Sequence, residues 1–427
     1  MDFKSESLCL FDEKDVQLDI IGNIQTDYHP TTSLTSGGPI EFYIPGAVGE
    51  YVDLSDMQLF VRVKILQGNG KDLTATDDVA LINQPISSLF QDAYLMVHDK
   101  QIEGGQHCYP YNGYISSLLQ FHPSAKKTHM ECWGWEEDEP GKFDDPTNND
   151  GYKQRKAETA ESSEWELLGP LFLDMTRQSR FLLPQVDLRV KLHPAKAEFV
   201  LQSPTAGASY KYQITKAILY ARRVRVKDEV INGHTVGLKA RNAKYHINHV
   251  DITSFTINSG VSNYIKDQLY ASQTPKMLIV GLLDHVAFNG SINTNPFNFQ
   301  HFNLDKIGLY RDGELVPGQV FTPDFPKDMY LRSYAALMRV LNYFNTDDSN
   351  GMTLEHFKDG YTLFGFDLTP DAQCSAPYRS IHFSSSLRLE MNFAKALPKT
   401  ITVMLFAVFD SRVEITGLRD VITSYAR

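Results

Sequence analysis

The residue pairs whose types and spacing come closest to a metal site are His246 with His249 and His129 with Cys132. Imidazole and thiolate groups are common ligands of zinc and other transition metals. His246 and His249 stand in a run that favours an extended strand, where residues three apart point to opposite faces, so the two rings cannot bind one ion. His129 and Cys132 lie beside two tryptophans without a second pair of ligands, which favours an aromatic cluster that anchors a loop. We therefore predict structural roles for all four residues and no metal site.

Motifs of known catalytic machinery are missing from the sequence. It contains no His-x-His pair of the kind found in metal-binding jelly-roll enzymes, no GxSxG and no HExxH. The run from Gly68 to Lys71 lacks the spacing of a phosphate-binding loop and is typical of a hairpin turn. Asp367 and Asp371 fall in a Pro-containing turn. We predict that the protein is not an enzyme, has no catalytic residues and binds no cofactor.

One strand candidate carries a basic face. In the run from Arg222 to Lys227, alternation places Arg223, Arg225 and Lys227 on one side of the strand. Such a ridge could meet DNA, an inner membrane or acidic residues of a neighbouring subunit, and a purely surface contact would be sensitive to salt. A solvated strand face is an equally good interpretation, so both stay open.

Charge and cysteine content narrow the class of function. The 427 residues carry a formal net charge of −11, which argues against broad binding of nucleic acid through phosphate contacts. Four scattered cysteines without a CxxC pair predict neither a disulfide framework nor a zinc knuckle. No apolar run approaches the roughly 18 residues of a membrane span, and Met1 to Ile21 includes acids where a signal peptide would begin with basic residues. We expect a protein that works inside a cell or inside a particle.

Period-two alternation of apolar residues dominates the chain and predicts an all-β protein. Clear strand candidates are residues 59–65, 93–97, 186–192 and 387–393. Helical spacing recurs at 109–121, at 330–344 and in part of 8–21. Acidic residues gather between Glu136 and Asp150 with two prolines and a glycine, which predicts an exposed loop.

The order of elements occurs twice. In each half a strand, ending at Ile102 or at Leu315, is followed by a Gly-rich or Pro-rich connection, a helix and closing strands. The closing strands are expected at 181–192 and 197–201 in the first half, and at 386–393 and 400–409 in the second. Two antiparallel units of about 200 residues each predict two eight-stranded jelly rolls with short accessory helices and long loops.

The expected boundary between the two units is a small, polar and breaker-rich segment at 203–209. This division gives an N-terminal arm at 1–30, a first jelly roll at 31–202, a linker at 203–209 and a second jelly roll at 210–427.

Several short segments recur in a fixed order along the chain. They are residues 40–46 (IEFYIPG) with 50–54 (EYVDL), 87–92 (SSLFQD), 109–114 (YPYNGY), 290–299 (GSINTNPFNF) and 359–371 (DGYTLFGFDLTPD). Together these segments resemble the major capsid proteins of Polinton (Maverick) elements and of related adintovirus-like viruses. The resemblance spans about residues 40 to 425, and the order of the segments carries more of it than any one segment.

This resemblance implies a subunit of two jelly rolls side by side, three copies of which form a pseudo-hexagonal capsomer similar to adenovirus hexon. Two barrels per chain and three chains give six barrels about one axis, so a three-fold object fits a six-fold lattice. The implied function is structural, in the icosahedral shell of a double-stranded DNA virus or virus-like transposon. The implied location is the virion capsid, assembled inside the host cell.

The implied partners are two further copies of the chain, neighbouring capsomers, and penton or minor capsid proteins. Sequence-specific nucleic acid is not expected, and the presence of an inner membrane stays open. The apolar residues of the N-terminal arm are expected to dock beneath a neighbour or on an inner layer, or else to form an edge strand of their own barrel.

Aromatic residues in the predicted loops exceed what two barrels would hold. We expect several of them between subunits, because obligate interfaces are large, apolar and aromatic. The candidate intersubunit contacts are Trp133, Trp135, Phe143, Tyr152, Phe297 and Phe299.

Two other functions stay open at this point. A carbohydrate- or receptor-binding β-sandwich would show a shallow aromatic cleft and no lattice-forming sides. Another capsid component of the same elements is the second alternative, although a vertex penton protein would need only one jelly roll.

Overall fold

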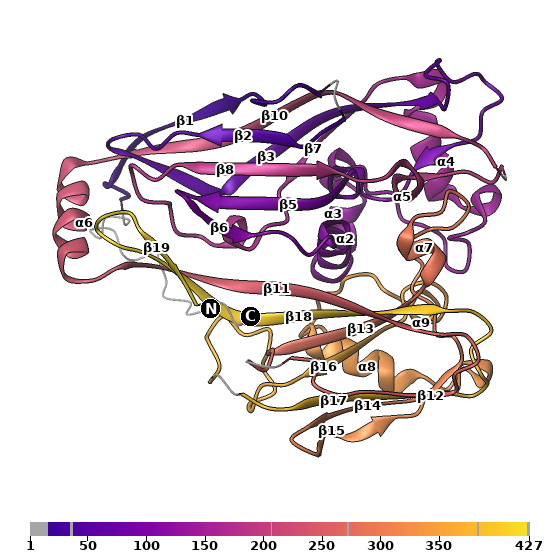
Figure 1. Cartoon of the computed structure of the whole chain (residues 1–427). Helices are drawn as coiled ribbons and strands as arrows, with labels where there is room; N and C mark the ends of the chain where they lie inside the picture. The colour runs from indigo at the N-terminus through magenta and orange to yellow at the C-terminus, as the bar shows by residue number, and fades with distance from the viewer. Residues whose placement is uncertain (1–15, 35–36, 206, 271–272, 382–383, 425–427) are drawn as a thin grey trace, which may run out of the picture.

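Antiparallel strands form four main sheets, which are grouped in two units (Figure 1). The computed structural model describes residues 16–34, 37–205, 207–270, 273–381 and 384–424. In Figure 1 the strands of both units run in a common direction, and the two units lie one against the other along their length.

The first unit contains two four-stranded sheets. One has the order β1 (Ile20–Tyr28), β10 (Tyr210–Val226), β3 (Glu50–Gln67) and β7 (Trp165–Pro170). The other has the order β2 (Ile40–Ile44), β8 (Leu188–Pro194), β5 (Phe90–Val97) and β6 (Lys100–Glu103). A short pair, β4 (Ala80–Leu81) with β9 (Leu201–Gln202), stands apart from both sheets.

The second unit repeats this construction. One sheet has the order β11 (Ala243–Ile257), β18 (Ile401–Ile415), β13 (Met277–Asp284) and β16 (Leu363–Asp367), and β19 (Val421–Thr423) also pairs with β18. The other has the order β12 (Asn263–Lys266), β17 (Leu387–Phe393), β14 (Leu304–Arg311) and β15 (Glu314–Phe321).

The two units have the same topology. If the eight main strands of each unit are numbered in chain order, one sheet runs one, eight, three, six and the other runs two, seven, four, five in both units. This is the strand order of a jelly roll, in which the chain crosses repeatedly between two packed sheets. The prediction of two eight-stranded antiparallel jelly rolls is confirmed, and so is the repeated order of elements.

The change from one jelly roll to the other falls later than the predicted linker. Strand β10 follows the segment at 203–209, yet it pairs with β1 and β3 of the first jelly roll as its eighth strand. The chain then passes through helix α6 (Asp228–Ala240) to β11. The range 1–30 also contains β1, which is the first strand of that jelly roll and not a free arm. We therefore propose domain boundaries at the start of β1 and within 227–242.

Helices are accessories to the sheets. The remaining ones are α1 (Pro85–Ser88), α2 (Tyr109–Gln120), α3 (Pro123–Lys126), α4 (Asp150–Glu158), α5 (Ala197–Val200), α7 (His285–Asn289), α8 (Leu331–Val340) and α9 (Leu354–Lys358). The helix predictions at 109–121 and 330–344 are confirmed by α2 and α8. None of these helices, in the ranges that the structure describes, is long and apolar enough to cross a membrane.

Three local predictions differ from the structure. Residues 197–201 were expected as a strand, but their first four residues form α5 after Lys196. Helices α4 and α6 were not predicted. The sequence of α4 is polar and has no clear apolar stripe, and α6 packs on the core only through the half-buried side chains of Val230, Ile231 and Leu238. The predicted helix in 8–21 lies largely outside the described residues, and its last residues, Ile20 and Ile21, begin β1.

Alternation of buried and half-buried residues explains most strands. In β17, Leu387, Leu389, Met391 and Phe393 are buried, while the residues between them are half-buried. β18 differs, because its first 11 residues are all buried, which is the pattern of a strand covered on both faces. The centre of this sheet is therefore covered on both faces, whereas its edge strand β11 keeps exposed residues on one face.

Candidate assembly interface between the two jelly rolls

The two jelly rolls are joined by a core of aromatic side chains. Tyr114 of α2 stacks on Phe297 of the second jelly roll with ring centroids 4.0 Å apart, and Trp135 stacks on the other side of Tyr114 at 5.5 Å. Tyr111, one helical turn away, contacts both Phe297 and Phe288 at 5.6 Å. Aromatic pairs of this kind add about 0.5–1.5 kcal/mol each beyond the burial of their surface.

The predicted intersubunit contacts lie inside the single chain. Five of the six have exposed fractions of 2% or less: Trp135, Phe143, Tyr152, Phe297 and Phe299. Trp133 is half-buried and packs on Phe121 and Phe172. The prediction is corrected for the five buried side chains, because in this conformation they have no surface to offer to another subunit. Trp135, Phe143 and Phe297 form part of the junction between the barrels, which needs a core of its own. Tyr152 bonds to Asp78 within the first unit, and Phe299 lies against Gly360 within the second.

A buried ion pair stands beside this aromatic core. The guanidinium of Arg155 donates to the carboxylate of Asp138 over 2.7 Å, and both side chains are fully buried. Arg155 also donates to the carbonyls of Leu81 and Glu136. Asp138 in turn accepts hydrogen bonds from Asn149 at 2.8 Å and from Asn295 of the second jelly roll at 3.3 Å.

The acidic segment at 136–150 is thus only partly the exposed loop that the sequence predicts. Asp138 is buried, and the carboxylate of Asp144 accepts from the backbone of Asn295 at 2.6 Å and from the side chain of Asn298 at 2.8 Å. Burial raises the pKa of Asp144, although these hydrogen bonds act in the opposite direction. The carboxylates of this segment thus accept hydrogen bonds from the second jelly roll.

Polar side chains of the first jelly roll cap the free edge of strand β11. The Asp174 carboxylate, just after β7, accepts from the backbone N–H of Val250 at 3.2 Å. The Gln106 side chain accepts from Ile252 N–H, and Arg180 donates to the carbonyl of Lys244. An edge strand exposes a row of unpaired backbone groups, and these side chains satisfy three of them along the outer edge of β11.

A buried network of acids and one histidine lies at the same contact. The Nδ1 atom of His249 is 2.7 Å from the Asp174 carboxylate. Glu103 accepts from the backbone N–H groups of Asp174 and Met175 at 2.7 and 2.9 Å. Burial, together with the charge of Asp174, raises the pKa of Glu103 to about 8. Burial lowers the pKa of His249, but its hydrogen bond to Asp174 outweighs this effect, so that the net pKa is raised.

The histidines that could be mistaken for metal ligands lie on different faces of β11 or beside a tryptophan, as the sequence predicts. His246 is exposed on β11 and His249 is half-buried three residues later, next to Asp174. His129 lies against Trp133, with ring centroids 6.1 Å apart. Across the ranges that the structure covers, no group of three or more His, Cys, Asp and Glu is placed to hold a metal ion.

The basic strand face is largely neutralised. Arg223 is buried and donates to Tyr28 Oη at 2.7 Å and to the carbonyl of Pro45 at 2.6 Å. Arg225 pairs with Glu50, which lies directly opposite it in the register of β10 and β3, at 3.0 Å. Lys227 is half-buried at the start of α6. A single strand does not reveal its cross-strand partner, so the sequence alone could not show this neutralisation.

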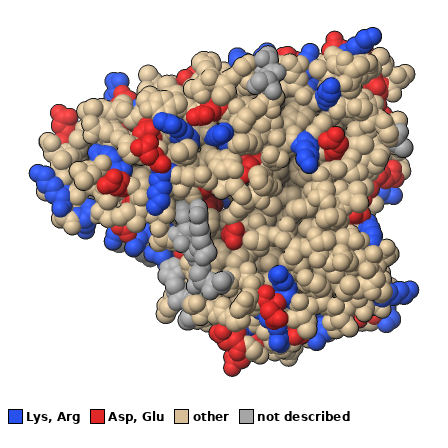
Figure 2. Space-filling model, in the orientation of Figure 1, with Lys and Arg blue, Asp and Glu red and all other residues tan. Residues whose placement is uncertain are grey.

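Charges of both signs are mixed over the visible surface. Figure 2 shows Lys and Arg interspersed with Asp and Glu, without a large area of one sign on this face. The predicted hairpin turn at Gly68 to Lys71 is present, with the N–H of Gly70 donating to the carbonyl of Gln67 at 2.8 Å. Asp367 lies in the predicted turn, where its carboxylate accepts from the N–H of Thr369 at 2.8 Å.

The fold defines the class of protein that the chain resembles. A pair of identically wound jelly rolls, joined along their length by an apolar core, is the double jelly-roll arrangement. Solved structures with this arrangement match almost the entire chain. One is a chain of the Sputnik virophage structure determined by cryo-electron microscopy, with a TM-score of 0.65, 13% identity, and coverage of 100% of this chain and 93% of that chain.

Two major capsid proteins are also similar in structure. The Faustovirus major capsid protein has a TM-score of 0.59 and 11% identity, with 96% of this chain and 93% of that chain covered. The mavirus major capsid protein has a TM-score of 0.52 and 11% identity, with coverage of 94% and 90%. At these identities the likeness concerns the fold.

A sequence relative that covers most of the chain is found in Caenorhabditis elegans. The uncharacterized protein F54H12.2 is 23% identical over 396 residues, which cover 90% of this chain and 92% of that protein. No protein-family model matches the chain.

Proposed function

We propose that this chain is the major capsid protein of an icosahedral double-stranded DNA virus or virus-like transposon, and that it assembles as a homotrimeric, pseudo-hexagonal capsomer. One observation carries the proposal: two jelly rolls of identical topology lie side by side and are joined by a buried core. Three such chains about one axis present six barrels of the same topology, and this pseudo-six-fold arrangement fits a hexagonal lattice position.

The rigidity of the junction supports this role. A shell subunit has to keep the angle between its two barrels fixed, because that angle sets the closure of the trimer. The stacked rings of Tyr114 and Phe297 bridge the two units. The buried pair of Asp138 and Arg155 lies in the first unit, and Asp138 accepts a hydrogen bond from Asn295 of the second. A flexible tether would leave the relative position of the units unspecified.

An affiliation with Polinton (Maverick) elements is the more specific part of the proposal. The segments that carry the resemblance include 109–114 and 290–299, and these two segments contain the residues Tyr111, Tyr114 and Phe297 that stack across the junction. The motifs are thus the parts of the chain that build the paired barrels. A relative of nearly the same length in a nematode is consistent with an element carried in animal genomes.

The partners and location follow from this function. The chain would contact two further copies of itself within a capsomer, other capsomers across the lattice, and penton or minor capsid proteins at the vertices. Its place would be the virion capsid, after assembly inside the host cell.

Light scattering coupled to gel filtration tests the proposal. Purified full-length chain at micromolar concentration is expected to elute as a species of three times the 48.4 kDa chain mass. Electron microscopy of the same fraction is expected to show particles with six lobes. A stable monomer under these conditions would contradict the proposal.

A further inference from the structure

The first strands of the two jelly rolls are equivalent in topology but differ in their surroundings. β11 has its outer edge capped by Asp174, Gln106 and Arg180 of the first jelly roll. β1 is the corresponding edge strand of the first jelly roll, and no other strand pairs with its outer edge in the described part of the chain. None of its nine residues is buried, whereas β11 buries Tyr245, Ile247, Val250 and others.

Large apolar side chains accumulate on this open strand. Ile21 and Ile24 of β1 have exposed fractions of 64% and 54%, and Val16 and Leu18 just before the strand are also exposed. A long, apolar edge strand left open in water is a site at which another chain adds or packs. Exposed acids lie at Asp27 in the strand and at Asp19 just before it.

A second open surface lies on the other side of the chain. In the first jelly roll, the loop after the sixth strand is largely buried and presents Asp174, four residues beyond Pro170, to β11. In the second jelly roll, the loop after β16 is largely exposed and presents Asp371, four residues beyond Asp367. The loop also exposes Tyr378 and Ile381.

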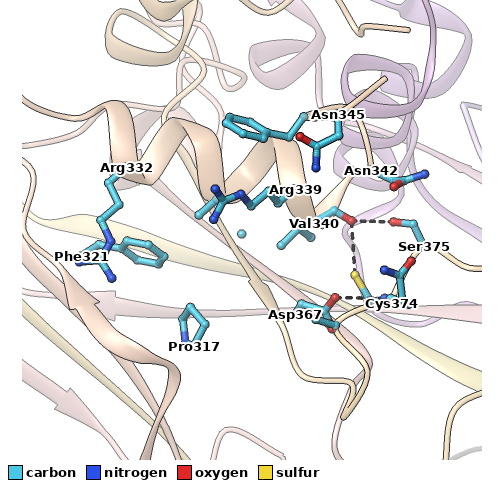
Figure 3. A pocket seen from close by; sticks show the side chains of 15 residues that line it. Pro317, Phe321, Arg332, Arg339, Val340, Asn342, Asn345, Asp367, Cys374 and Ser375 are labelled. Atoms are coloured by element: carbon cyan, nitrogen blue, oxygen red, sulfur yellow. Dashed lines mark hydrogen bonds between the residues drawn. The ribbon is translucent and has the colours of Figure 1, made fainter. Parts of the chain in front are cut away.

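Helix α8 and this loop line a hollow (Figure 3). The cavity has a volume of about 450 Å³ and is bounded by α8, by β15 and by residues 372–375. In Figure 3, Arg332 and Arg339 extend from α8 at its rim. Their guanidinium groups lie over the rings of Phe321 and Phe344. We call the set of Arg332, Ala336, Arg339, Asp371 and Tyr378 the α8 surface.

We propose that the α8 surface of one copy is covered by strand β1 of the next copy, in the way that the first jelly roll covers β11 within each chain. This inference rests on the proposed capsomer. The contact between two copies then has the same arrangement as the contact between the two jelly rolls of one chain. Each copy contacts one neighbour through β1 and the other neighbour through its α8 surface. Such a heterologous contact closes into a ring.

Charge and chemistry agree with this occupant. Asp27 on β1 and Asp19 just before the strand are opposite in sign to Arg332 and Arg339 on the α8 surface, and complementary signs set partner and orientation. The Asp371 carboxylate lies on the exposed loop, where it accepts from Tyr378 Oη at 2.7 Å and from Thr369 and the backbone of its own turn. It would accept a backbone N–H of β1 in exchange for one of these bonds, as Asp174 accepts from Val250.

The test uses two variants that each disable one surface. Ile24→Arg places a charge on β1, and the double variant Ala336→Arg with Asp371→Arg blocks the α8 surface. These positions are exposed or half-buried, so the fold of the single chain is expected to persist, as circular dichroism and thermal melting would verify. The controls are Val48→Arg and Leu418→Arg, at positions 81% and 86% exposed and outside both surfaces.

Each variant alone is expected to be monomeric by light scattering at concentrations where the wild type is a trimer, with association weakened on the order of 100-fold or more. An equal mixture of the two variants is expected to form a one-to-one dimer and nothing larger, because only one intact pair of surfaces remains. The control variants are expected to form trimers.

The other outcomes separate the inference from the proposed function. A wild-type trimer with both variants still trimeric would overturn the inference and leave the capsomer in place. Monomeric variants that fail to form a dimer on mixing would show that the two surfaces do not meet each other, and would overturn it as well. A wild-type monomer would overturn the capsomer, and with it this inference.

Discussion

Helices α2 and α8 occupy the same position in the two jelly rolls, since each connects the fifth strand to the sixth, but they differ in burial. Ten of the 12 residues of α2 are buried, against four of the ten in α8. The second jelly roll covers α2, and nothing in the described chain covers the outer side of α8. Topology therefore sets where a helix lies, while the neighbouring unit decides how much of it is buried.

The sequences of the two helices differ in charge in the same way as the helices differ in burial. α2 (YPYNGYISSLLQ) has no charged residue on any side, which is the composition of a helix surrounded by protein. α8 (LRSYAALMRV) places Arg332 and Arg339 seven residues apart on its outer side. If the α8 surface meets a second copy, that contact is more polar and more easily reversed than the junction around α2.

Two matched truncations would show the largest difference between these regions. Phe297→Ala removes a fully buried ring at the α2 junction, and we expect a loss of about 3–5 kcal/mol in the free energy of unfolding. Phe344→Ala removes a ring that is 47% exposed beside α8, and we expect a loss below about 1 kcal/mol. Urea denaturation of both variants measures the two values. Equal losses would contradict the view that the junction around α2 is a true core.

The buried ion pair provides a second test of the junction. Asp138→Asn leaves Arg155 charged and buried without its partner, and we expect a loss of about 3 kcal/mol or more. The control is Glu166→Gln, which breaks an exposed pair with Arg62 and should cost less than about 1 kcal/mol. Thermal unfolding of both variants gives the comparison. A neutral Asp138→Asn variant would mean that the pair is dispensable.

The acid and histidine network predicts a pH dependence of stability. The pKa of Glu103 is raised to about 8 by burial first and by Asp174 second, so the folded state holds a proton that the unfolded chain releases above about pH 4.5. The pKa of His249 is also raised, against the effect of burial, by its bond to Asp174. Burial raises the pKa of Asp251 nearby, although His249 opposes this.

All three shifts have the same sign. Each stabilises the folded protein at low pH, and that contribution is lost as pH rises from about 5 to beyond 8. We expect the free energy of unfolding to fall by an amount on the order of 2 kcal/mol between pH 5.5 and pH 8.5. Glu103→Gln, which keeps the two backbone hydrogen bonds without a titrating group, should flatten most of this slope. A wild-type stability that rises over the same interval would show that the assignment is wrong.

The smallest effect is expected on the outer side of α8. Leu331→Ala, at a position 61% exposed, should change the stability of the isolated chain by no more than about 0.5 kcal/mol. Leu118→Ala on α2, where the side chain is 1% exposed, should cost about 2–5 kcal/mol. Both changes would be measured in the Ile24→Arg background, so that association does not contribute. A large effect of Leu331→Ala would indicate a covered α8 face within the chain.

Features that depend on local pattern could be predicted from the sequence. Strands such as β17 and helices such as α2 and α8 follow from periodicity, because one face of each packs on a core. The repeated order of elements also led to two jelly rolls, since the same series of strands must close the same sheets.

Features that depend on distant partners could not be predicted. The linker was expected at 203–209 because its residues are small and polar, but β10 is held in the first jelly roll by pairing with β1 and β3. The basic face at Arg223 and Arg225 is neutralised by Glu50, which is more than 170 residues away in the chain. Of the aromatic residues assigned to an interface between subunits, Trp135, Phe143 and Phe297 belong to the junction between the two units of one chain, a distinction that composition does not make.

Cryo-electron microscopy of the purified full-length assembly tests the central claim most directly. Views along the symmetry axis are expected to show three copies forming six barrels in a ring, with β1 of each copy against α8 of the next. Single chains with two lobes, or rings of any other number of copies, would contradict the account.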